Sequence, residues 1–262
     1  MMPRLYAIVD AGVLAGRGVR LEEFAQGLRA AGVGLVQYRD KDGSPREVLR
    51  AAEVLRTVMR SDLPRQTQKP SDMGHPILDI GDPFDMGRPI LIMNDRADLA
   101  VLAGFDGVHV GQGDLSPEDA KRVMSGKAIH PFSEDEKGWA TRVVQLRDEW
   151  GTQLARGGIV GVSTHTEAQV IAANAGVADY VAIGPVFATG TKLDAAAVVG
   201  LEGVRRARAL TSKPLVAIGG ITRANARSVI DAGADSVAVI SGLLAEGESV
   251  EQVARDFLEP LG

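Results

Sequence analysis

With 262 residues, of which 45% are hydrophobic, the chain has a globular composition and a length that suits one or two domains, or one α/β barrel of about 250 residues. Its net charge of −5 argues against general nucleic-acid binding, which needs a basic face, and the absence of cysteine excludes disulfides, thiolate catalysis and cysteine-bound zinc. Residues 1–10 lack a long apolar signal region and no run approaches the roughly 18 apolar residues of a membrane span, so we expect a cytoplasmic protein with no membrane or nucleic-acid partner.

Eight short apolar runs, rich in valine and isoleucine, are predicted to be β-strands. They do not alternate with polar residues, which is typical of strands with both faces buried in a parallel sheet. Most of the segments between them have apolar residues at helical spacing. The predicted strands are Leu5–Val9, Gly34–Tyr38, Ile90–Met93, Gly107–Val110, Ile159–Val162, Tyr180–Ile183, Leu215–Ile218 and Ser236–Ile240.

Several helix boundaries are visible in the sequence. Residues 21–31 carry an apolar stripe that stops at Gly32, which indicates a helix ending there. Ser116 is a predicted N-cap, because a proline and then two acids follow it in the first helical turn. Thr166 and Thr222 are predicted to start two further helices.

Repeated strand-and-helix units predict an α/β fold, a (β/α)8 TIM barrel that forms a single domain over residues 1–262. A doubly wound open sheet is the structural alternative. The barrel is favoured because there are eight units and because no Gly-x-Gly-x-x-Gly follows an early strand.

Two stretches, 61–89 and 126–157, are interpreted as insertions. The first is rich in proline, aspartate and glycine, and the second carries mixed charge with Trp139 and Trp150 at a spacing that suits one helical face. We expect each to be an excursion with a small apolar patch, and the alternative is a lid or a subunit contact. The oligomeric state stays open, a homo-oligomer included.

Polar clusters follow the predicted strands, and in a barrel the carboxyl ends of the strands open on the active-site face. Gln37, Arg39 and Lys41 alternate at the end of the second strand, so they share one side of an extended segment. The planar fork of Arg39 can hold two phosphate oxygens and Lys41 adds a compact charge. The alternative is a solvated charged loop.

Asn94 and Asp95 end the third strand, and Asp114 follows the fourth after a Gly-Gln-Gly turn. Carboxylates from neighbouring strand ends can share one Mg²⁺, which needs only one or two of them beside phosphate oxygens and water. The alternatives are a helix cap for Asp95 and a simple turn residue for Asp114.

Three glycine- or threonine-rich loops are candidate anion sites. Thr189, Thr191 and Lys192 follow the sixth strand and combine small hydroxyls with one ammonium, although the segment also fits a plain flexible loop. Gly219-Gly220-Ile221 follows the seventh strand and Ile240-Ser241 the eighth, where barrels of this type commonly bind phosphate through backbone amides.

The four histidines carry less information. His109 lies within the fourth strand and is interpreted as a residue of the barrel interior or strand end. His165 follows the fifth strand and could reach the pocket, whereas His75 and His130 fall in the insertions. No histidine array indicates zinc, and no Gly-x-Ser-x-Gly indicates a serine hydrolase.

Taken together, these motifs resemble the thiamin phosphate synthase family. They occur in the order found in that family and extend over nearly the whole chain outside the two insertions. The motifs are Gln37/Arg39/Lys41, Asn94-Asp95, Gly111-Gln-Gly-Asp114, Gly161-Val-Ser-Thr-His-Thr166, Thr189-Gly-Thr-Lys192, Gly219-Gly-Ile221 and Ile240-Ser241.

The resemblance implies a Mg²⁺-dependent enzyme that joins hydroxymethylpyrimidine pyrophosphate to thiazole phosphate, giving thiamin phosphate and pyrophosphate. It assigns the metal to Asp95 and Asp114, and contact with the pyrimidine to Ser163. It assigns the pyrophosphate to Gln37, Arg39, Lys41, Asn94 and Lys192, and thiazole phosphate to Thr189, Thr191, Gly220, Ile240 and Ser241. Arg39, Lys41 and Lys192 would stabilise the leaving group as its charge develops.

Two features depart from the resemblance. Gly113 stands where the family usually has glutamate, and the insertions lengthen the chain. Two rival functions stay open: a thiazole tautomerase of the same fold, which would use a histidine such as His165 and no Mg²⁺, and a non-catalytic sensor of phosphate ligands.

Overall fold

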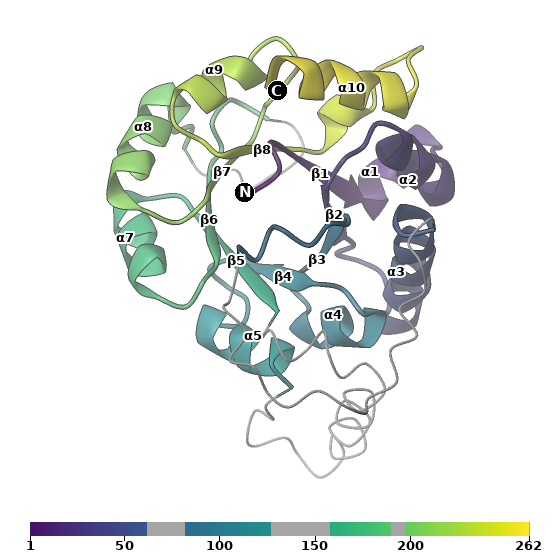
Figure 1. Ribbon diagram of the computed structural model, residues 1–262, viewed down its shortest axis with the longest axis horizontal. Helices are drawn as coiled ribbons and strands as arrows, with labels where there is room; N and C mark the ends of the chain where they lie inside the picture. The colour runs from purple at the N-terminus through teal and green to yellow at the C-terminus, as the bar shows by residue number, and fades with distance from the viewer. Residues whose placement is uncertain (62–81, 127–157, 190–196, 262) are drawn as a thin grey trace.

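The computed structural model describes residues 1–61, 82–126, 158–189 and 197–261 and shows a closed barrel of parallel strands in the order β1 to β8 (Figure 1). Each strand pairs with its neighbours in sequence, and β8 closes the ring against β1. The strands are β1 (Leu5–Asp10), β2 (Leu35–Arg39), β3 (Ile90–Asn94), β4 (Gly107–Val110), β5 (Ile159–Thr164), β6 (Tyr180–Ile183), β7 (Leu215–Ile218) and β8 (Ser236–Val239). The predicted TIM barrel is confirmed.

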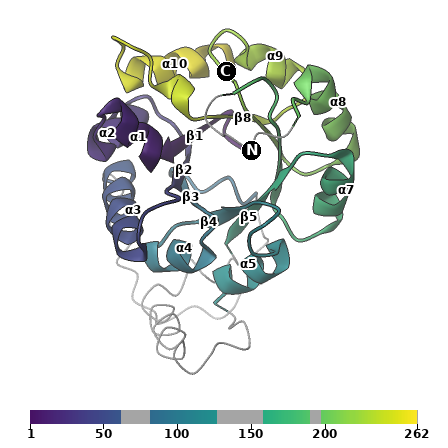
Figure 2. The ribbon, with the colours of Figure 1, turned by 180° about the vertical axis from the view of Figure 1, so that it is seen from behind.

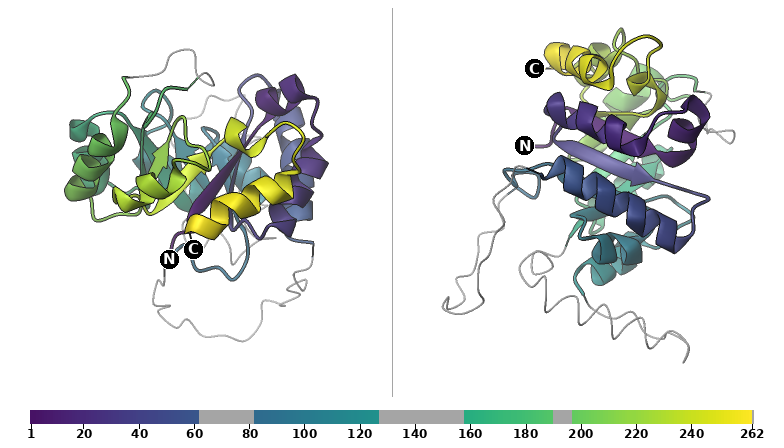
Figure 3. Two further views of the ribbon diagram at one scale, coloured as in Figure 1. Left: turned by 90° about the horizontal axis from the view of Figure 1, so that it is seen from above. Right: turned by 90° about the vertical axis from the view of Figure 1, so that its right-hand side faces the viewer.

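A ring of helices surrounds the strands, as the views from both ends of the barrel show (Figures 1 and 2). In the described part of the chain every strand is followed by at least one helix. The helices are α1 (Ala11–Arg17), α2 (Leu21–Ala30), α3 (Pro45–Met59), α4 (Ala97–Ala103), α5 (Pro117–Met124), α7 (Glu167–Ala175), α8 (Gly200–Leu210), α9 (Ala226–Asp231), the 3₁₀ turn η3 (Ser241–Leu243) and α10 (Val250–Leu261). Both termini lie at the same end of the barrel (Figure 3).

The structure corrects several predicted boundaries. Four strands run one or two residues further than expected, because their last residues are polar groups that still pair across the rim: β1 to Asp10, β2 to Arg39, β3 to Asn94 and β5 to Thr164. Conversely, β8 ends at Val239, one residue before the expected Ile240. The helix predicted for residues 21–31 ends at Ala30.

The predicted helix starts fare differently. Ser116 caps α5 by accepting from the backbone N–H of Asp119, and Thr166 forms a reciprocal capping box with Gln169. The start predicted at Thr222 is wrong, because α9 begins at Ala226. The backbone N–H of Thr222 instead donates to the Asn225 side chain, which closes a turn before the helix.

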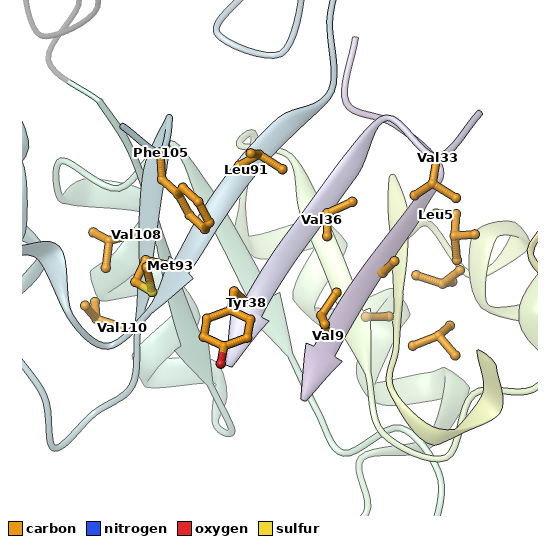
Figure 4. Close-up of a cluster of buried hydrophobic side chains, with 14 of the residues drawn as sticks. Leu5, Val9, Val33, Val36, Tyr38, Leu91, Met93, Phe105, Val108 and Val110 are labelled. Carbon is orange, nitrogen blue, oxygen red and sulfur yellow. The ribbon is translucent and has the colours of Figure 1, made fainter. Parts of the chain in front are cut away.

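The main apolar core lies between the strands and the surrounding helices. Alternate residues of each strand point outward and pack on the helices, as Val36 and Tyr38 of β2 and Leu91 and Met93 of β3 show (Figure 4). Since every strand is buried on both faces, the apolar runs in the sequence are continuous rather than alternating.

The residues that point inward form a second, smaller core along the barrel axis. Tyr6, Ile8, Leu35, Ile92 and Tyr180 belong to it. All of these inner side chains are at most 4% exposed, so the barrel is filled rather than hollow. On β1 to β5, the inward residues nearest the carboxyl ends of the strands are polar instead, and they form part of the site described below.

The described end of the first predicted insertion belongs to the barrel. Phe84 is only 6% exposed, and its ring packs edge-on at 6.0 Å between centroids from that of Tyr180. Arg88 donates to both carboxylate oxygens of the buried Asp106, which also accepts from Arg60 at 2.5 Å. Residues 82–89 therefore pack against the barrel, and the predicted insertion over 61–89 stays a prediction. The remainder of the insertion lies outside the described residues.

The second predicted insertion, with Trp139 and Trp150, falls almost wholly outside the described residues, and so do His75 and His130. Within the ranges that the structure describes, no helix combines the length and apolar character needed to cross a membrane.

Candidate active site

The polar inner layer at the carboxyl ends of the strands follows from strand parity. On β1, Tyr6 and Ile8 face the axis, so Asp10 does too, and its register partner on β2 is Arg39. Asn94 of β3 pairs in register with His109 of β4, which places both in the same layer. The site thus begins one layer above the apolar filling of the barrel.

Arg39 is held in place by Asp10. The Arg39 guanidinium forms an ion pair with Oδ2 of Asp10, and the two side chains are 17% and 6% exposed. The other Asp10 oxygen accepts from the backbone N–H of Val13 and caps α1. One carboxylate therefore fixes both the first helix and the predicted phosphate-binding arginine, a role that the lone aspartate did not reveal in the sequence.

Lys41, Asp95 and Asp114 come together from three different loops. Lys41 Nζ lies 3.1 Å from Oδ2 of Asp95, and the side chain of Asp114 interacts directly with that of Asp95. Burial raises the pKa of Asp95, and the neighbouring Asp114 carboxylate raises it further, while Lys41 opposes the shift. Two carboxylates held against each other in this way favour a shared cation.

Local geometry supports that arrangement. Asp95 has φ +61°, which non-glycine residues seldom adopt, and its backbone N–H donates to the carbonyl of His109 at 2.8 Å. It does not cap the following helix, since the N-cap of α4 is Arg96 with no side-chain bond. Asp114 does close its own turn, accepting from the Gly111 N–H at 2.8 Å, so the structural alternative for Asp114 is observed alongside its contact with Asp95.

The donor set fits Mg²⁺ held jointly by protein and ligand. Among the described residues, no group of three or more histidine, aspartate or glutamate side chains could form a cage around a metal by itself. Asp95 and Asp114 supply two hard oxygen donors, and magnesium commonly takes one or two carboxylates and completes its shell with water and phosphate oxygens. Nothing in this donor set resembles a zinc site.

Ser163, expected to contact the pyrimidine, is tied into the barrel interior by a chain of hydrogen bonds. Its hydroxyl lies 2.8 Å from His109 Nε2, and His109 Nδ1 lies 2.9 Å from the Tyr180 hydroxyl. The Tyr180 hydroxyl is 2.9 Å from that of Tyr6, which accepts from Gln37 Nε2 at 2.8 Å. Gln37 is 3% exposed, and the Tyr6 contact uses only one of the two N–H bonds of its amide.

The loop after β4 reaches over to β5. Gln112 Nε2 donates to the Ser163 carbonyl at 2.6 Å, which connects the Asp114 turn to the strand that carries Ser163. Gln112 was not among the predicted site residues. The family motif contains this glutamine, but the sequence alone does not show which strand its side chain reaches.

The turns after β6, β7 and β8 gather into one region. Gly219 and Gly220 have φ of +105° and +64°, and a Cβ on Gly220 would lie 2.6 Å from the carbonyl of Ala188, so the backbones approach too closely for a side chain. A Cβ on Gly242 would lie 3.1 Å from the carbonyl of Ile221. The loops that carry Gly220, Ile240, Ser241 and Thr189 are therefore adjacent, as a shared phosphate site requires.

A surface clamp fixes the β7 and β8 loops. Arg223 forms ion pairs with Glu248 at 2.7 Å and with Asp256 of α10 at 2.6 Å. The hydrogen bond from Arg223 lowers the pKa of Glu248, and hydrogen bonds from Gln252 and then Arg223 lower the pKa of Asp256.

The predicted residues Thr191 and Lys192 lie outside the described residues, so their contribution stays a prediction. His165 is described, and its Nδ1 lies 2.6 Å from the carbonyl of Gly184, which fixes the ring beside the start of the β6 loop. His109 was interpreted as an interior or strand-end residue, and the structure confirms this. What sequence reasoning missed was its connection to Ser163.

Comparisons with known proteins agree with the family resemblance of the sequence motifs. The family model described as thiamine monophosphate synthase matches residues 78–135 and 144–243. The thiamine-phosphate synthase of Koribacter versatilis is 42% identical over 262 residues, covering 99% of this chain and 96% of the relative. That of Chloroflexus aurantiacus is 35% identical over 254 residues, covering 97% and 90%.

A solved structure described as thiamine phosphate pyrophosphorylase from Pyrococcus furiosus superposes with a TM-score of 0.68 at 25% identity, covering 98% of this chain and 95% of that one. A second pyrophosphorylase, from Bacteroides thetaiotaomicron, has a TM-score of 0.56 at 13% identity and supports the fold alone. The sequence motifs, the barrel and the full-length relatives lead to one conclusion. The chain belongs to the thiamine monophosphate synthase family.

Proposed function

We propose that this transferase couples 4-amino-2-methyl-5-hydroxymethylpyrimidine pyrophosphate with 4-methyl-5-(2-hydroxyethyl)thiazole phosphate, giving thiamin phosphate and pyrophosphate, and that it requires Mg²⁺. The single observation that carries the proposal is the cluster of Lys41, Asp95 and Asp114 beside the Asp10-held Arg39. Paired carboxylates with adjacent cations suit a polyphosphate and its metal, whereas a phosphate monoester alone would need only the cations.

The pyrophosphate substrate is bound by residues from β2, β3 and the β6 loop. Arg39 presents a planar fork that matches two phosphate oxygens, and Lys41, 51% exposed, can turn from Asp95 toward the ligand. Gln37 and Asn94 add amide donors, and Lys192 adds a further charge by family resemblance. Asp95 and Asp114 would hold Mg²⁺, which would neutralise charge on the phosphate oxygens.

The chemical step breaks the C–O bond between the pyrimidine methylene and pyrophosphate. The electron pair leaves with the bridging oxygen, so negative charge grows there, and Arg39, Lys41 and Lys192 stabilise it more in the transition state than before. The 4-amino group delocalises the cation left on the pyrimidine. The thiazole nitrogen then donates its lone pair to the methylene carbon and forms the new C–N bond.

No protein nucleophile takes part in this sequence. The protein contributes position and charge: it holds the thiazole nitrogen on line with the methylene carbon and excludes water that would trap the cation. Thr189, Thr191, Gly220, Ile240 and Ser241 bind thiazole phosphate. Two phosphate sites on one rim suit a joining reaction better than a hydrolysis.

The rival functions differ in what they consume. A tautomerase would act on a thiazole precursor without Mg²⁺ or the pyrimidine substrate, and a sensor would form no product. We therefore propose incubating the purified protein with both substrates, with each alone and with a thiazole precursor, each with Mg²⁺ and with EDTA. Thiamin phosphate formed only with both substrates and Mg²⁺ supports the proposal. Isomerisation of the precursor in EDTA, or no product in any mixture, overturns it.

A further inference from the structure

A continuous chain of buried hydrogen bonds runs from Gln37 through Tyr6, Tyr180 and His109 to Ser163. Tyr6 is 1% exposed and Tyr180 fully buried, so no ligand reaches their hydroxyls without displacing core side chains. The family resemblance implies roles for the two ends of this hydrogen-bond chain, Gln37 and Ser163. The three residues between them have no part in the mechanism above.

The backbone is built to let this chain form. His109, Gly161 and Tyr180 are consecutive register partners across β4, β5 and β6, so a side chain on β5 would separate the other two. Gly161 has none, and a Cβ there would lie 1.9 Å from Cζ of Tyr180. The Tyr180 ring therefore crosses over Gly161 and stacks on His109, with centroids 5.5 Å apart and planes inclined by 27°.

Counting protons along the chain fixes its direction. Gln37 Nε2 donates to the Tyr6 oxygen, and burial raises the pKa of Tyr6 and of Tyr180, so both phenols keep their single proton. The Tyr6 proton therefore goes to the Tyr180 oxygen. The Tyr180 proton then goes to His109 Nδ1, which must be an acceptor.

An imidazole that accepts at Nδ1 carries its proton at Nε2, and it donates from there to Ser163 Oγ at 2.8 Å. One lone pair of the Ser163 oxygen is thus taken by His109, and the hydroxyl proton is available to a ligand.

We propose that His109 is a positioning residue whose neutral Nε2–H tautomer, set by the Tyr6–Tyr180 pair, makes Ser163 a hydrogen-bond donor and so selects substrates with an unprotonated ring nitrogen at that point. The inference rests on the proposed function, since it names the feature of the pyrimidine that Ser163 recognises. A substrate that presents an N–H there, such as a deaminated pyrimidinone tautomer, could not accept the Ser163 proton and would bind more weakly.

The test combines Tyr180→Phe with histidine NMR. Tyr180→Phe removes one oxygen that cannot touch substrate and releases His109 Nδ1 from its donor. Tyr38→Phe is the matched control, because Tyr38 is also buried. Its hydroxyl donates to Asp40 at 3.3 Å on the outer face of β2, so it takes no part in the hydrogen-bond chain from Gln37 to Ser163. Thermal unfolding of both variants checks that the barrel is intact.

The ¹⁵N NMR spectrum of the histidine side chains reports the tautomer of His109 without any substrate. The protein has only four histidines, so the resonances lost in His109→Gln are those of His109. We expect wild-type His109 to be protonated at Nε2 and bare at Nδ1, and Tyr180→Phe to give a mixture of tautomers. Tyr180→Phe should also raise KM for the pyrimidine pyrophosphate by roughly 2- to 10-fold, the range produced by losing one neutral hydrogen bond, with KM for thiazole phosphate unchanged.

A wild-type spectrum with the proton at Nδ1 or on both nitrogens overturns the inference, and so does a Tyr180→Phe variant with unchanged tautomer or unchanged KM. Equal rises in both KM values, or the same rise in Tyr38→Phe, overturn it as well, because they show a general structural effect. If the wild-type protein makes no thiamin phosphate, the proposed function fails. The ¹⁵N spectrum still decides whether the Tyr6–Tyr180 pair sets the tautomer of His109.

Discussion

Replacing Asp10 by asparagine should remove the ion pair that fixes the Arg39 side chain, while α1 stays capped. Asp10 uses one oxygen for the Val13 N–H and the other for Arg39, whereas asparagine has one oxygen and one NH₂ group. Asparagine is a favoured N-cap, so the oxygen stays with Val13 and the NH₂ group then faces the guanidinium.

The magnitude follows from burial. Since Asp10 and Arg39 are 6% and 17% exposed, solvent compensates little for the lost charge-assisted hydrogen bond, and Asp10→Asn should lower the free energy of unfolding by about 1.5–3 kcal/mol. Asp10→Ala also removes the cap and should cost about 1 kcal/mol more. Because Arg39 loses its fixed position, kcat/KM should fall by up to about 10²-fold.

Urea unfolding followed by circular dichroism measures the stability of both variants, and initial-rate assays measure kcat/KM. Asp231→Asn is the control, because it breaks an exposed i,i+4 pair with Arg227 at 2.8 Å that should contribute at most about 0.5 kcal/mol. The reasoning is refuted if Asp10→Asn unfolds within about 0.5 kcal/mol of the wild type, or if it is no more stable than Asp10→Ala.

Four further changes have defined outcomes. Lys192→Ala should reduce kcat by about 10²-fold or more, the scale of losing one preorganised charge-stabilising donor, and near-normal turnover in a steady-state assay would exclude that role. Asp95→Asn should move the Mg²⁺ titration of activity to higher concentration, and an unchanged titration argues against ligation by Asp95. Gly113→Glu should fold normally, since a Cβ at Gly113 meets nothing within 4 Å, and should lower the Mg²⁺ concentration needed; a large loss of thermal stability would contradict this. Phe84→Ala should cost about 3–5 kcal/mol in urea unfolding, because Phe84 is 6% exposed against Tyr180, and a change below about 1 kcal/mol would show that residues 82–89 do not support the barrel.

The fold could be predicted because parallel barrels bury both faces of every strand. Apolar runs such as Tyr180–Ile183 coincide with observed strands, and Ser116 and Thr166 cap helices as expected. The predicted strand ends were wrong where polar residues continue a strand into the site, as at Asp10 and Arg39. The apolar run in the sequence stops there, but the backbone pairing continues. The start predicted at Thr222 failed because the chain first forms a turn, closed by the Asn225 side chain, and α9 begins only at Ala226.

The site was predictable at the level of which loops take part. Strand order places Lys41, Asp95 and Asp114 on neighbouring strand ends, and the structure brings them into contact. The partners of these residues were not predictable, since the Asp10–Arg39 pair and the path from Tyr6 to Ser163 depend on which side chains point inward at the same height in the barrel. Sequence separation, 29 residues for the first pair, carries no such information.

One measurement addresses the central claim most directly: ³¹P NMR of a reaction that contains both substrates, Mg²⁺ and wild-type protein, followed in time. We predict that pyrophosphate and thiamin phosphate appear at equal rates, and that omitting the thiazole phosphate suppresses pyrophosphate release. Pyrophosphate released at the same rate without thiazole phosphate would show hydrolysis rather than coupling, and consumption of neither substrate would contradict the assignment of this rim to the joining reaction.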